Sequence, residues 1–144
     1  MKIAIIGSGN LGLSIAKGLV YNNTYTSLYL TKRELNSIKK WEEYNNVKIT
    51  TDNQEAVKNA DIIIFTVQPG QFDGILEQIK GVLTEKHILI SAITGYSIQR
   101  METQLGENYP IIRSMPNTAI SVGKSMTCLC SNVAGENRIA IAEA

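Results

Sequence analysis

The six residues Gly7-Ser8-Gly9-Asn10-Leu11-Gly12 constrain the fold of this chain more than any other stretch of its sequence. They form a G-x-G-x-x-G pattern that directly follows the apolar run 3–6 and opens a helical pattern of apolar residues over 11–19. A buried strand, a glycine turn and a helix in this order are typical of a βαβ unit that binds a dinucleotide. A strand, turn and helix that bind no ligand are the alternative interpretation.

Each glycine of the pattern has its own predicted task. Gly7 allows the tight turn, Gly9 lets the backbone approach a pyrophosphate, and Gly12 lets the helix pack closely on the strand. The free N–H groups and the positive end of the helix dipole then face the phosphates. We therefore expect the whole loop to bind the cofactor, through Gly7, Ser8, Gly9, Asn10, Leu11 and Gly12.

The end of the second expected strand, 27–31, predicts which dinucleotide binds. An acidic residue about 20 positions after the glycines would hold the 2′-hydroxyl of NAD. The strand instead ends in Thr31-Lys32-Arg33, and Glu34 already belongs to the helix expected next. A hydroxyl and two cations suit a 2′-phosphate, because arginine binds phosphate oxygens in bidentate fashion. The turn predicts NADP(H) in preference to NAD(H), with a solvated basic turn as the alternative.

The rest of the chain alternates between strand and helix patterns. We expect helices over 34–44, 54–58, 72–83 and 97–105, and further strands over 47–50, 61–67, 87–91, 110–114 and 125–130. The tail 134–144 reads as the first turns of another helix. This alternation predicts an α/β fold with a doubly wound, mostly parallel sheet, in one Rossmann-type domain over residues 1–144.

Ligands of a doubly wound sheet bind outside the carboxyl ends of the strands. The glycine loop and the segments 31–33, 66–69 and 94–95 all follow expected strands, so we place adenine at the basic turn and nicotinamide towards the later strands. The segment 115–118 follows another strand and completes the nicotinamide side. The sequence shows no Ser-His-Asp set, no paired carboxylates and no P-loop. A reductase needs no strong acid–base group of its own if its substrate is already an electrophilic imine, because the cofactor carries the hydride chemistry.

We assign no site role to the tryptophan, the histidine or the two cysteines. Trp41 belongs to a buried stripe of the helix 34–44 and is not expected to stack on a base. His87, the only histidine, begins its strand and so lies at the edge opposite the ligand. Cys128 and Cys130 are expected to be reduced packing residues, and with one histidine elsewhere they give poor support for a metal site.

The composition sets limits on location and partners. With 44% hydrophobic and 19% charged residues and a net charge of +1, the chain has no field that would favour nucleic acid or an anionic membrane. The apolar run before Gly7 is too short for a signal-peptide core. No apolar run approaches the roughly 18 residues of a membrane span. The cytoplasm is therefore the expected location.

Taken in order, these motifs resemble the N-terminal domain of the pyrroline-5-carboxylate reductases over essentially the whole chain. The resemblance rests on Ile5-Ile6 with the glycine loop, Thr31-Lys32-Arg33, Asn53, Thr66-Val67-Gln68-Pro69, Ser91-Ala92-Ile93-Thr94-Gly95 and, most specifically, Arg113-Ser114-Met115-Pro116-Asn117-Thr118. It implies an adenosine-side role for Asn53. It also implies cofactor contacts for Thr66, Val67, Gln68, Pro69, Thr94 and Gly95, and substrate-side roles for Met115, Pro116, Asn117 and Thr118.

The chain departs from that family in sequence and in length. Gln68 replaces the usual lysine and removes a cation near the cofactor, Thr94 replaces a small alanine, and Ala119 replaces a proline. Members of the family continue into a helical C-terminal domain that makes the dimer and supplies much of the substrate pocket. We expect the tail 134–144 to begin the helix that leads to such a domain, which is absent from these 144 residues.

The resemblance implies NADPH-dependent reduction of 1-pyrroline-5-carboxylate to proline, with this chain as the cofactor-binding part and a homo-oligomer as the full-length protein. It assigns no catalytic residue within the chain. A related short-acid reductase of the 3-hydroxyisobutyrate type is one alternative, although its glycine-rich substrate motif is not found here. A non-catalytic module that binds or senses a dinucleotide is the other.

Overall fold

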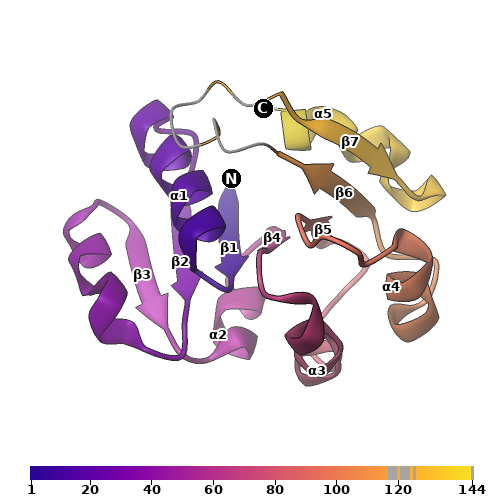
Figure 1. Cartoon of the computed structure of the whole chain (residues 1–144), viewed down its shortest axis with the longest axis horizontal. Helices are drawn as coiled ribbons and strands as arrows, with labels where there is room; N and C mark the ends of the chain where they lie inside the picture. The colour runs from indigo at the N-terminus through magenta and orange to yellow at the C-terminus, as the bar shows by residue number, and fades with distance from the viewer. Residues whose placement is uncertain (117–119, 121–123, 125, 144) are drawn as a thin grey trace.

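A seven-stranded sheet organises the computed structural model, which describes residues 1–116, 120, 124 and 126–143 (Figure 1). Its strand order is β3-β2-β1-β4-β5-β6-β7. The strands are β1 Lys2–Ile6, β2 Ser27–Thr31, β3 Val47–Thr50, β4 Ile62–Phe65, β5 Ile88–Ser91, β6 Ile111–Met115 and β7 Cys128–Ser131. Every neighbouring pair is parallel except β6 and β7, which are antiparallel. The predicted doubly wound, mostly parallel sheet is confirmed, and its switch point lies between β1 and β4, beside the glycine loop.

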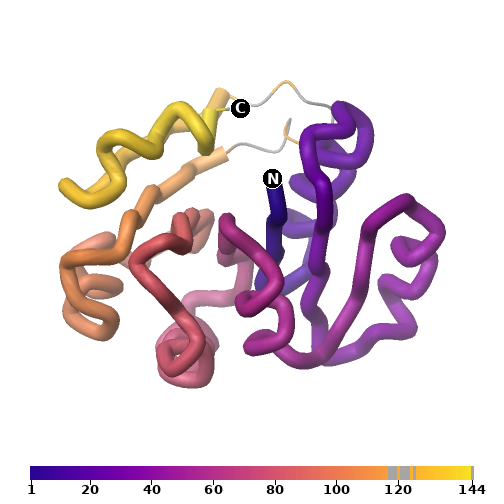
Figure 2. Tube along the Cα trace, turned by 180° about the vertical axis from the view of Figure 1, so that it is seen from behind, coloured from indigo at the N-terminus to yellow at the C-terminus, as the bar shows by residue number. Residues whose placement is uncertain are grey.

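Helices cover both faces of the sheet. They are α1 Asn10–Asn22, η1 Leu35–Glu43, α2 Asn53–Lys58, α3 Pro69–Ile79, α4 Ile98–Leu105, η3 Val133–Arg138 and α5 Ile139–Glu143. Both views show α2, α3 and α4 along one side and α1 and α5 along the other (Figures 1 and 2). Ala4 and Phe72 belong to the apolar cluster on the first side, and Ile5 and Ala16 belong to the cluster on the second. Burial from both sides explains why the central strands are almost wholly apolar.

The helix expected over 34–44 is present, but its turns are tighter than those of an α-helix. It forms the 3₁₀ helix η1, Leu35–Glu43. Its apolar residues Leu35, Ile38 and Trp41 recur every third position, and a helix of three residues per turn aligns them on one face. Ile38 and Trp41 are buried, and the Trp41 ring lies 5.3 Å from that of Tyr44 between centroids. The predicted packing role of the tryptophan is confirmed.

Helix α3 begins at Pro69, where a missing N–H costs nothing, and it ends at Ile79 rather than at Leu83 as expected. The chain turns at Lys80 and Gly81, and the N–H of Leu83 donates to the Ile79 carbonyl at 3.1 Å. Leu83 still packs in the core from this turn. The apolar periodicity therefore predicted the buried residues correctly, although the last of them lie outside the helix.

The expectation that Cys128 and Cys130 are packing residues is wrong. Both are free thiols, and both are exposed. Leu129 between them packs against the apolar cluster on the α1 side of the sheet. Because successive residues of a strand point to opposite faces, the cysteines lie on the other face of the edge strand β7. The two-residue period showed that the cysteines share a face, but not that this face is exposed.

His87 has a structural role at the amino end of β5. Its side chain is buried, and its Nδ1 accepts a hydrogen bond of 2.9 Å from the N–H of Thr84. The strand begins at the next residue, Ile88. The histidine therefore lies at the edge away from the carboxyl ends of the strands, as predicted.

Candidate functional site

The glycine loop joins β1 to α1 through a conformation that requires glycine at its first position. Gly7 has a φ of +94°, in the region that side chains avoid, and a Cβ there would lie 2.4 Å from Cγ1 of Val67. Its N–H donates to the Thr31 hydroxyl at 3.3 Å, and the N–H of Ser8 donates to the Thr31 carbonyl at 2.8 Å. The end of β2 thus holds the start of the loop.

Gly12 brings the first turn of α1 onto the end of β4. A Cβ at this position would lie 2.7 Å from Oγ1 of Thr66 and 2.8 Å from the carbonyl oxygen of Gly7. The same Thr66 hydroxyl donates to the Gly7 carbonyl at 2.7 Å. The predicted role of Gly12 in close packing is confirmed, and Thr66 has a positioning role that the sequence did not indicate.

We expect Gly12→Ala to lower the free energy of unfolding by about 1–3 kcal/mol, because the added methyl group overpacks the close contact with the Thr66 hydroxyl and the Gly7 carbonyl. Urea unfolding followed by circular dichroism measures the change. Gly18→Ala is the matched control, since a Cβ at this other glycine of α1 meets no described atom within 4 Å. The control should gain about 0.5–1 kcal/mol. Equal stability of Gly12→Ala and the native chain would contradict the close contact.

Open space adjoins Gly9, the residue that caps α1. A Cβ on Gly9 would meet no described atom within 4 Å, and its backbone is extended, with φ −82° and ψ −158°. The helix has no side-chain cap and no acidic residue in its first turn. The N–H groups of Asn10, Leu11 and Gly12 have no acceptor within the part of the chain that the structure describes. Such a terminus suits an anion.

Ser8 adds a polar atom to this loop. Its side chain is fully buried, and its hydroxyl has no hydrogen-bond partner among the described residues. Buried polar groups are nearly always paired, so an orphan at this position suits a ligand or a water molecule. The unpaired N–H groups, the open space at Gly9 and this hydroxyl together fit a diphosphate.

The three residues of the basic turn after β2 differ in exposure: Thr31 is buried, Lys32 is half-buried and Arg33 is exposed. Thr31 is 2% exposed, with its hydroxyl bound by the N–H of Gly7 as described above. Lys32 is half-buried, and its N–H donates to the Thr50 carbonyl at 3.3 Å. Arg33 is exposed and forms no ion pair with any described residue. Arg33 therefore has a guanidinium available for an anion, whereas contact of Thr31 with a phosphate stays a prediction.

The other predicted site residues follow the carboxyl ends of neighbouring strands. Asn53 begins α2, and its amide donates to Oε1 of Gln78 at 3.0 Å. Gln68 and Pro69 are exposed at the start of α3, and Thr94 and Gly95 are exposed after β5. Met115 is exposed at the end of β6 and precedes Pro116, while Asn117 and Thr118 lie outside the described residues. Because these strands are parallel, the segments share one edge of the sheet.

Tyr96 supports this edge, although no sequence motif indicated it. It is fully buried directly after the exposed pair Thr94 and Gly95. An aromatic residue just after a glycine at a strand end was the only sequence signal. The contacts of Tyr96 involve residues more than 20 positions away or on the next helix, so the signal could not reveal them.

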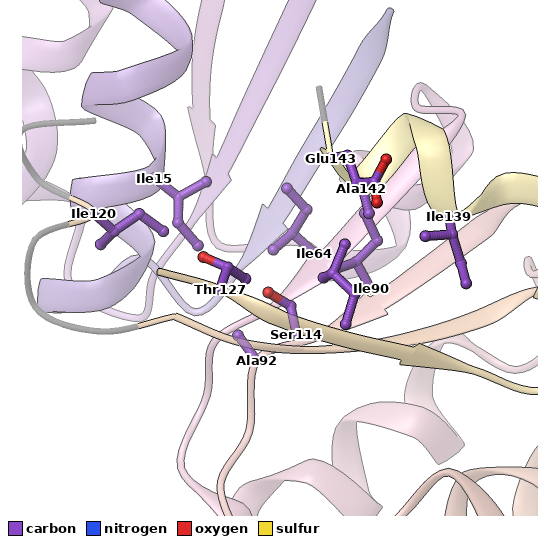
Figure 3. Close-up of a pocket in the computed structure, with 11 residues that line it drawn as sticks. Ile15, Ile64, Ile90, Ala92, Ser114, Ile120, Thr127, Ile139, Ala142 and Glu143 are labelled. Carbon is purple, nitrogen blue, oxygen red and sulfur yellow. The ribbon is translucent and has the colours of Figure 1, made fainter. Parts of the chain in front are cut away.

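A separate cavity of about 490 Å³ lies on the α1 and α5 side of the sheet (Figure 3). Most of the residues that line it are aliphatic, among them Ile15 of α1, Ile64 and Ile90 of the sheet and Ile139 of α5, and Ser114, Thr127 and Glu143 add polar groups. No residue of the glycine loop lines it. The described residues contain no group of His, Cys, Asp or Glu that could hold a metal, and no described helix is long and apolar enough to span a membrane.

The fold and the glycine loop define a Rossmann-type dinucleotide-binding domain. Residues 2–95 match the family model described as NADP oxidoreductase, coenzyme F420-dependent, and the chain belongs to that family.

Individual relatives carry a more specific name. The chain is 46% identical over 131 residues to pyrroline-5-carboxylate reductase 1 of Dictyostelium discoideum, covering 88% of this chain and 23% of that protein. It is 42% identical over 134 residues to pyrroline-5-carboxylate reductase 2 of the same organism, covering 90% and 45%. The chain thus spans less than half the length of these curated relatives.

Solved structures give the same result. The pyrroline-5-carboxylate reductase of Coxiella burnetii superposes with a TM-score of 0.90 at 32% identity, over 99% of this chain and 54% of that one. The Plasmodium falciparum pyrroline carboxylate reductase, solved with NADP bound, superposes with a TM-score of 0.79 at 25% identity, over 96% and 52%. The similarity to this group that the motifs indicated is confirmed.

Proposed function

We propose that this chain is the cofactor-binding part of an NADPH-dependent reductase that converts 1-pyrroline-5-carboxylate to proline. The observation that carries the proposal is the glycine loop, built for a diphosphate, in a chain 46% identical over 131 residues to a pyrroline-5-carboxylate reductase. The bound NADP of the Plasmodium falciparum relative supports the choice of cofactor.

Different segments of the chain bind different parts of the cofactor. In this proposal the first-turn N–H groups of α1 and the open side of Gly9 receive the pyrophosphate, and Lys32 and Arg33 receive the 2′-phosphate. Asn53 lies on the adenosine side. The nicotinamide lies between the segments 66–69 and 94–95, with 115–118 towards the substrate.

When bound, NADPH supplies a hydride to the carbon of the C=N bond. The residues of this chain hold and orient the cofactor, and no proton donor is assigned among them. The departures Gln68 and Thr94 lie in the two segments that flank the nicotinamide, so they bear on its orientation. Binding and chemistry can therefore be tested separately.

We expect residues 1–144 to bind NADPH but to reduce pyrroline-5-carboxylate at no more than a trace rate. The relatives are about twice as long or longer, and hydride transfer needs reacting atoms held roughly 3–3.5 Å apart. Titration by NADPH fluorescence measures binding, and substrate-dependent loss of absorbance at the NADPH band measures turnover. Both are run on residues 1–144 and on the full reading frame if it is longer.

The outcomes separate the proposed function from its alternatives. Robust turnover by residues 1–144 would contradict the division of tasks, and failure to bind NADPH would contradict the cofactor site. Binding without turnover by either form would favour a non-catalytic dinucleotide-binding module, which Gln68 in place of a lysine also favours. Turnover only with a short hydroxy acid and oxidised cofactor would favour the related acid reductases.

A further inference from the structure

Tyr96 is the end of a row of aromatic rings that crosses the core beside the candidate nicotinamide side. Phe65, the last residue of β4, lies 4.9 Å from Phe72 of α3 between ring centroids. Phe72 lies 4.6 Å from Tyr96 in an edge-on arrangement. All three side chains are fully buried. The row therefore connects the end of β4, helix α3 and the loop after β5 through packed, rigid groups.

A polar cluster completes this connection at the surface of α3 and α4. The Tyr96 hydroxyl donates to Oδ1 of Asp73, which also accepts from Nε2 of Gln104 at 2.6 Å. The second carboxylate oxygen accepts from Arg100 at 2.6 Å, and the Arg100 guanidinium lies 4.4 Å from the centre of the Tyr96 ring. Gln104 also donates to the Tyr96 hydroxyl at 3.0 Å. The hydroxyl is thus both donor and acceptor.

The loop after β5 is held on each side of its exposed tip. The N–H of Ala92 donates to the Phe65 carbonyl at 3.0 Å, and Ile93 is buried. Tyr96 is the buried anchor on the other side. The two residues between the anchors, Thr94 and Gly95, are exposed, and Gly95 has a φ of +74°. The position of the tip therefore depends on both anchors.

The partner of Tyr96, Asp73, lies on α3, the helix that follows the candidate site segment 66–69. Asp73 lies in the second turn of α3, which starts at Pro69 directly after Gln68. Because a short helix moves as one body, a bond to the Asp73 carboxylate also fixes the position of the N-terminus of α3. The contact spans the two segments, 66–69 and 94–95, between which the proposed function places the nicotinamide.

We propose that Tyr96 is a positioning residue that fixes, through Asp73, the spacing between the 94–95 tip and the start of α3, and so the geometry of the nicotinamide side of the cofactor site. This inference rests on the proposed function. We call the contact between Tyr96 and Asp73 the clamp. It acts on the nicotinamide half of the cofactor, whereas the described hydrogen bonds of its two residues do not reach the glycine loop or the basic turn.

The clamp keeps one protonation state in neutral solution. Burial, with the hydrogen bond to Asp73, raises the pKa of Tyr96 to about 12. The hydrogen bond from Tyr96 lowers the pKa of Asp73, and Arg100 and Gln104 lower it further. The hydroxyl therefore remains a donor and the carboxylate remains an acceptor, so binding assays near neutral pH test the geometry alone.

The test compares NADPH with adenosine 2′,5′-bisphosphate, which lacks the nicotinamide half. Tyr96→Phe removes the hydroxyl and keeps the ring, so we expect NADPH to bind about three- to tenfold more weakly. The affinity for the bisphosphate should stay unchanged. Asp73→Asn weakens the same clamp from a half-exposed position and should reproduce this split if Tyr96→Phe folds poorly. Tyr25→Phe is the matched control. Tyr25 precedes β2, away from the clamp, and the change removes a hydroxyl that donates to the Asn45 carbonyl at 2.8 Å.

Equal weakening of both ligands by Tyr96→Phe would indicate general loosening and overturn the inference. A fall in the unfolding temperature with both affinities unchanged would also overturn it, because the hydroxyl would then serve stability alone. If the native chain binds the bisphosphate but not NADPH, the nicotinamide does not bind where we place it, and this result would overturn the inference. A native chain that binds neither ligand would overturn the proposed function as well.

Discussion

We expect Gly9→Val to weaken NADPH binding roughly a hundredfold or more, while the unfolding temperature stays close to that of the native chain. The structure separates these two effects, because a Cβ on Gly9 meets no described atom within 4 Å. Its extended backbone also suits a β-branched residue. The isopropyl group would instead occupy the space assigned to the pyrophosphate, and overpacking of a few kcal/mol corresponds to a loss of this size.

Fluorescence titration with NADPH and thermal unfolding by circular dichroism measure the two quantities on the same sample. Gly18→Val is the matched control, since it adds the same group to open space further along α1. The control should bind NADPH as the native chain does. If Gly9→Val also kept its affinity, the cofactor would not cross this loop, and the N–H groups of the first turn of α1 would need another ligand.

The glycine loop could be predicted in detail from the sequence because its requirements recur wherever this strand–turn–helix unit occurs. A left-handed backbone at Gly7 and close contact at Gly12 exclude side chains wherever the strand–turn–helix occurs. The three-residue spacing of Leu35, Ile38 and Trp41 carried the same kind of information for η1. In the glycine loop the residue types express the constraints of a recurring structural unit, and in η1 they express the period of the helix.

What the sequence could not provide depends on contacts between distant segments. The hydrogen bond that the Thr31 hydroxyl accepts from the Gly7 N–H follows only from the pairing of β1 with β2. The exposure of Cys128 follows from its place on the edge strand β7. The clamp joins Tyr96 to Asp73, 23 positions earlier. No local pattern encodes any of these three features.

The binding of NADPH in preference to NADH is the second large effect that we expect, and Arg33 is the residue on which it depends. No acidic residue ends β2, and Glu34 is exposed at the N-cap of η1. The Arg33 guanidinium is exposed and forms no ion pair with the described residues. A 2′-phosphate would gain a charge-assisted hydrogen bond there, whereas a 2′-hydroxyl would gain little.

We therefore expect Arg33→Ala to lower the affinity for NADPH about ten- to a hundredfold, the equivalent of about 1.5–3 kcal/mol, and to leave the affinity for NADH unchanged. Parallel titrations of both cofactors measure the ratio, with Arg138→Ala, at an exposed arginine of η3, as the matched control. Equal affinity of the native chain for NADPH and NADH would mean that the basic turn binds no phosphate. Equal weakening of both cofactors by Arg33→Ala would instead place the guanidinium on a group that they share, such as the pyrophosphate, and would leave Lys32 as the remaining candidate for selectivity.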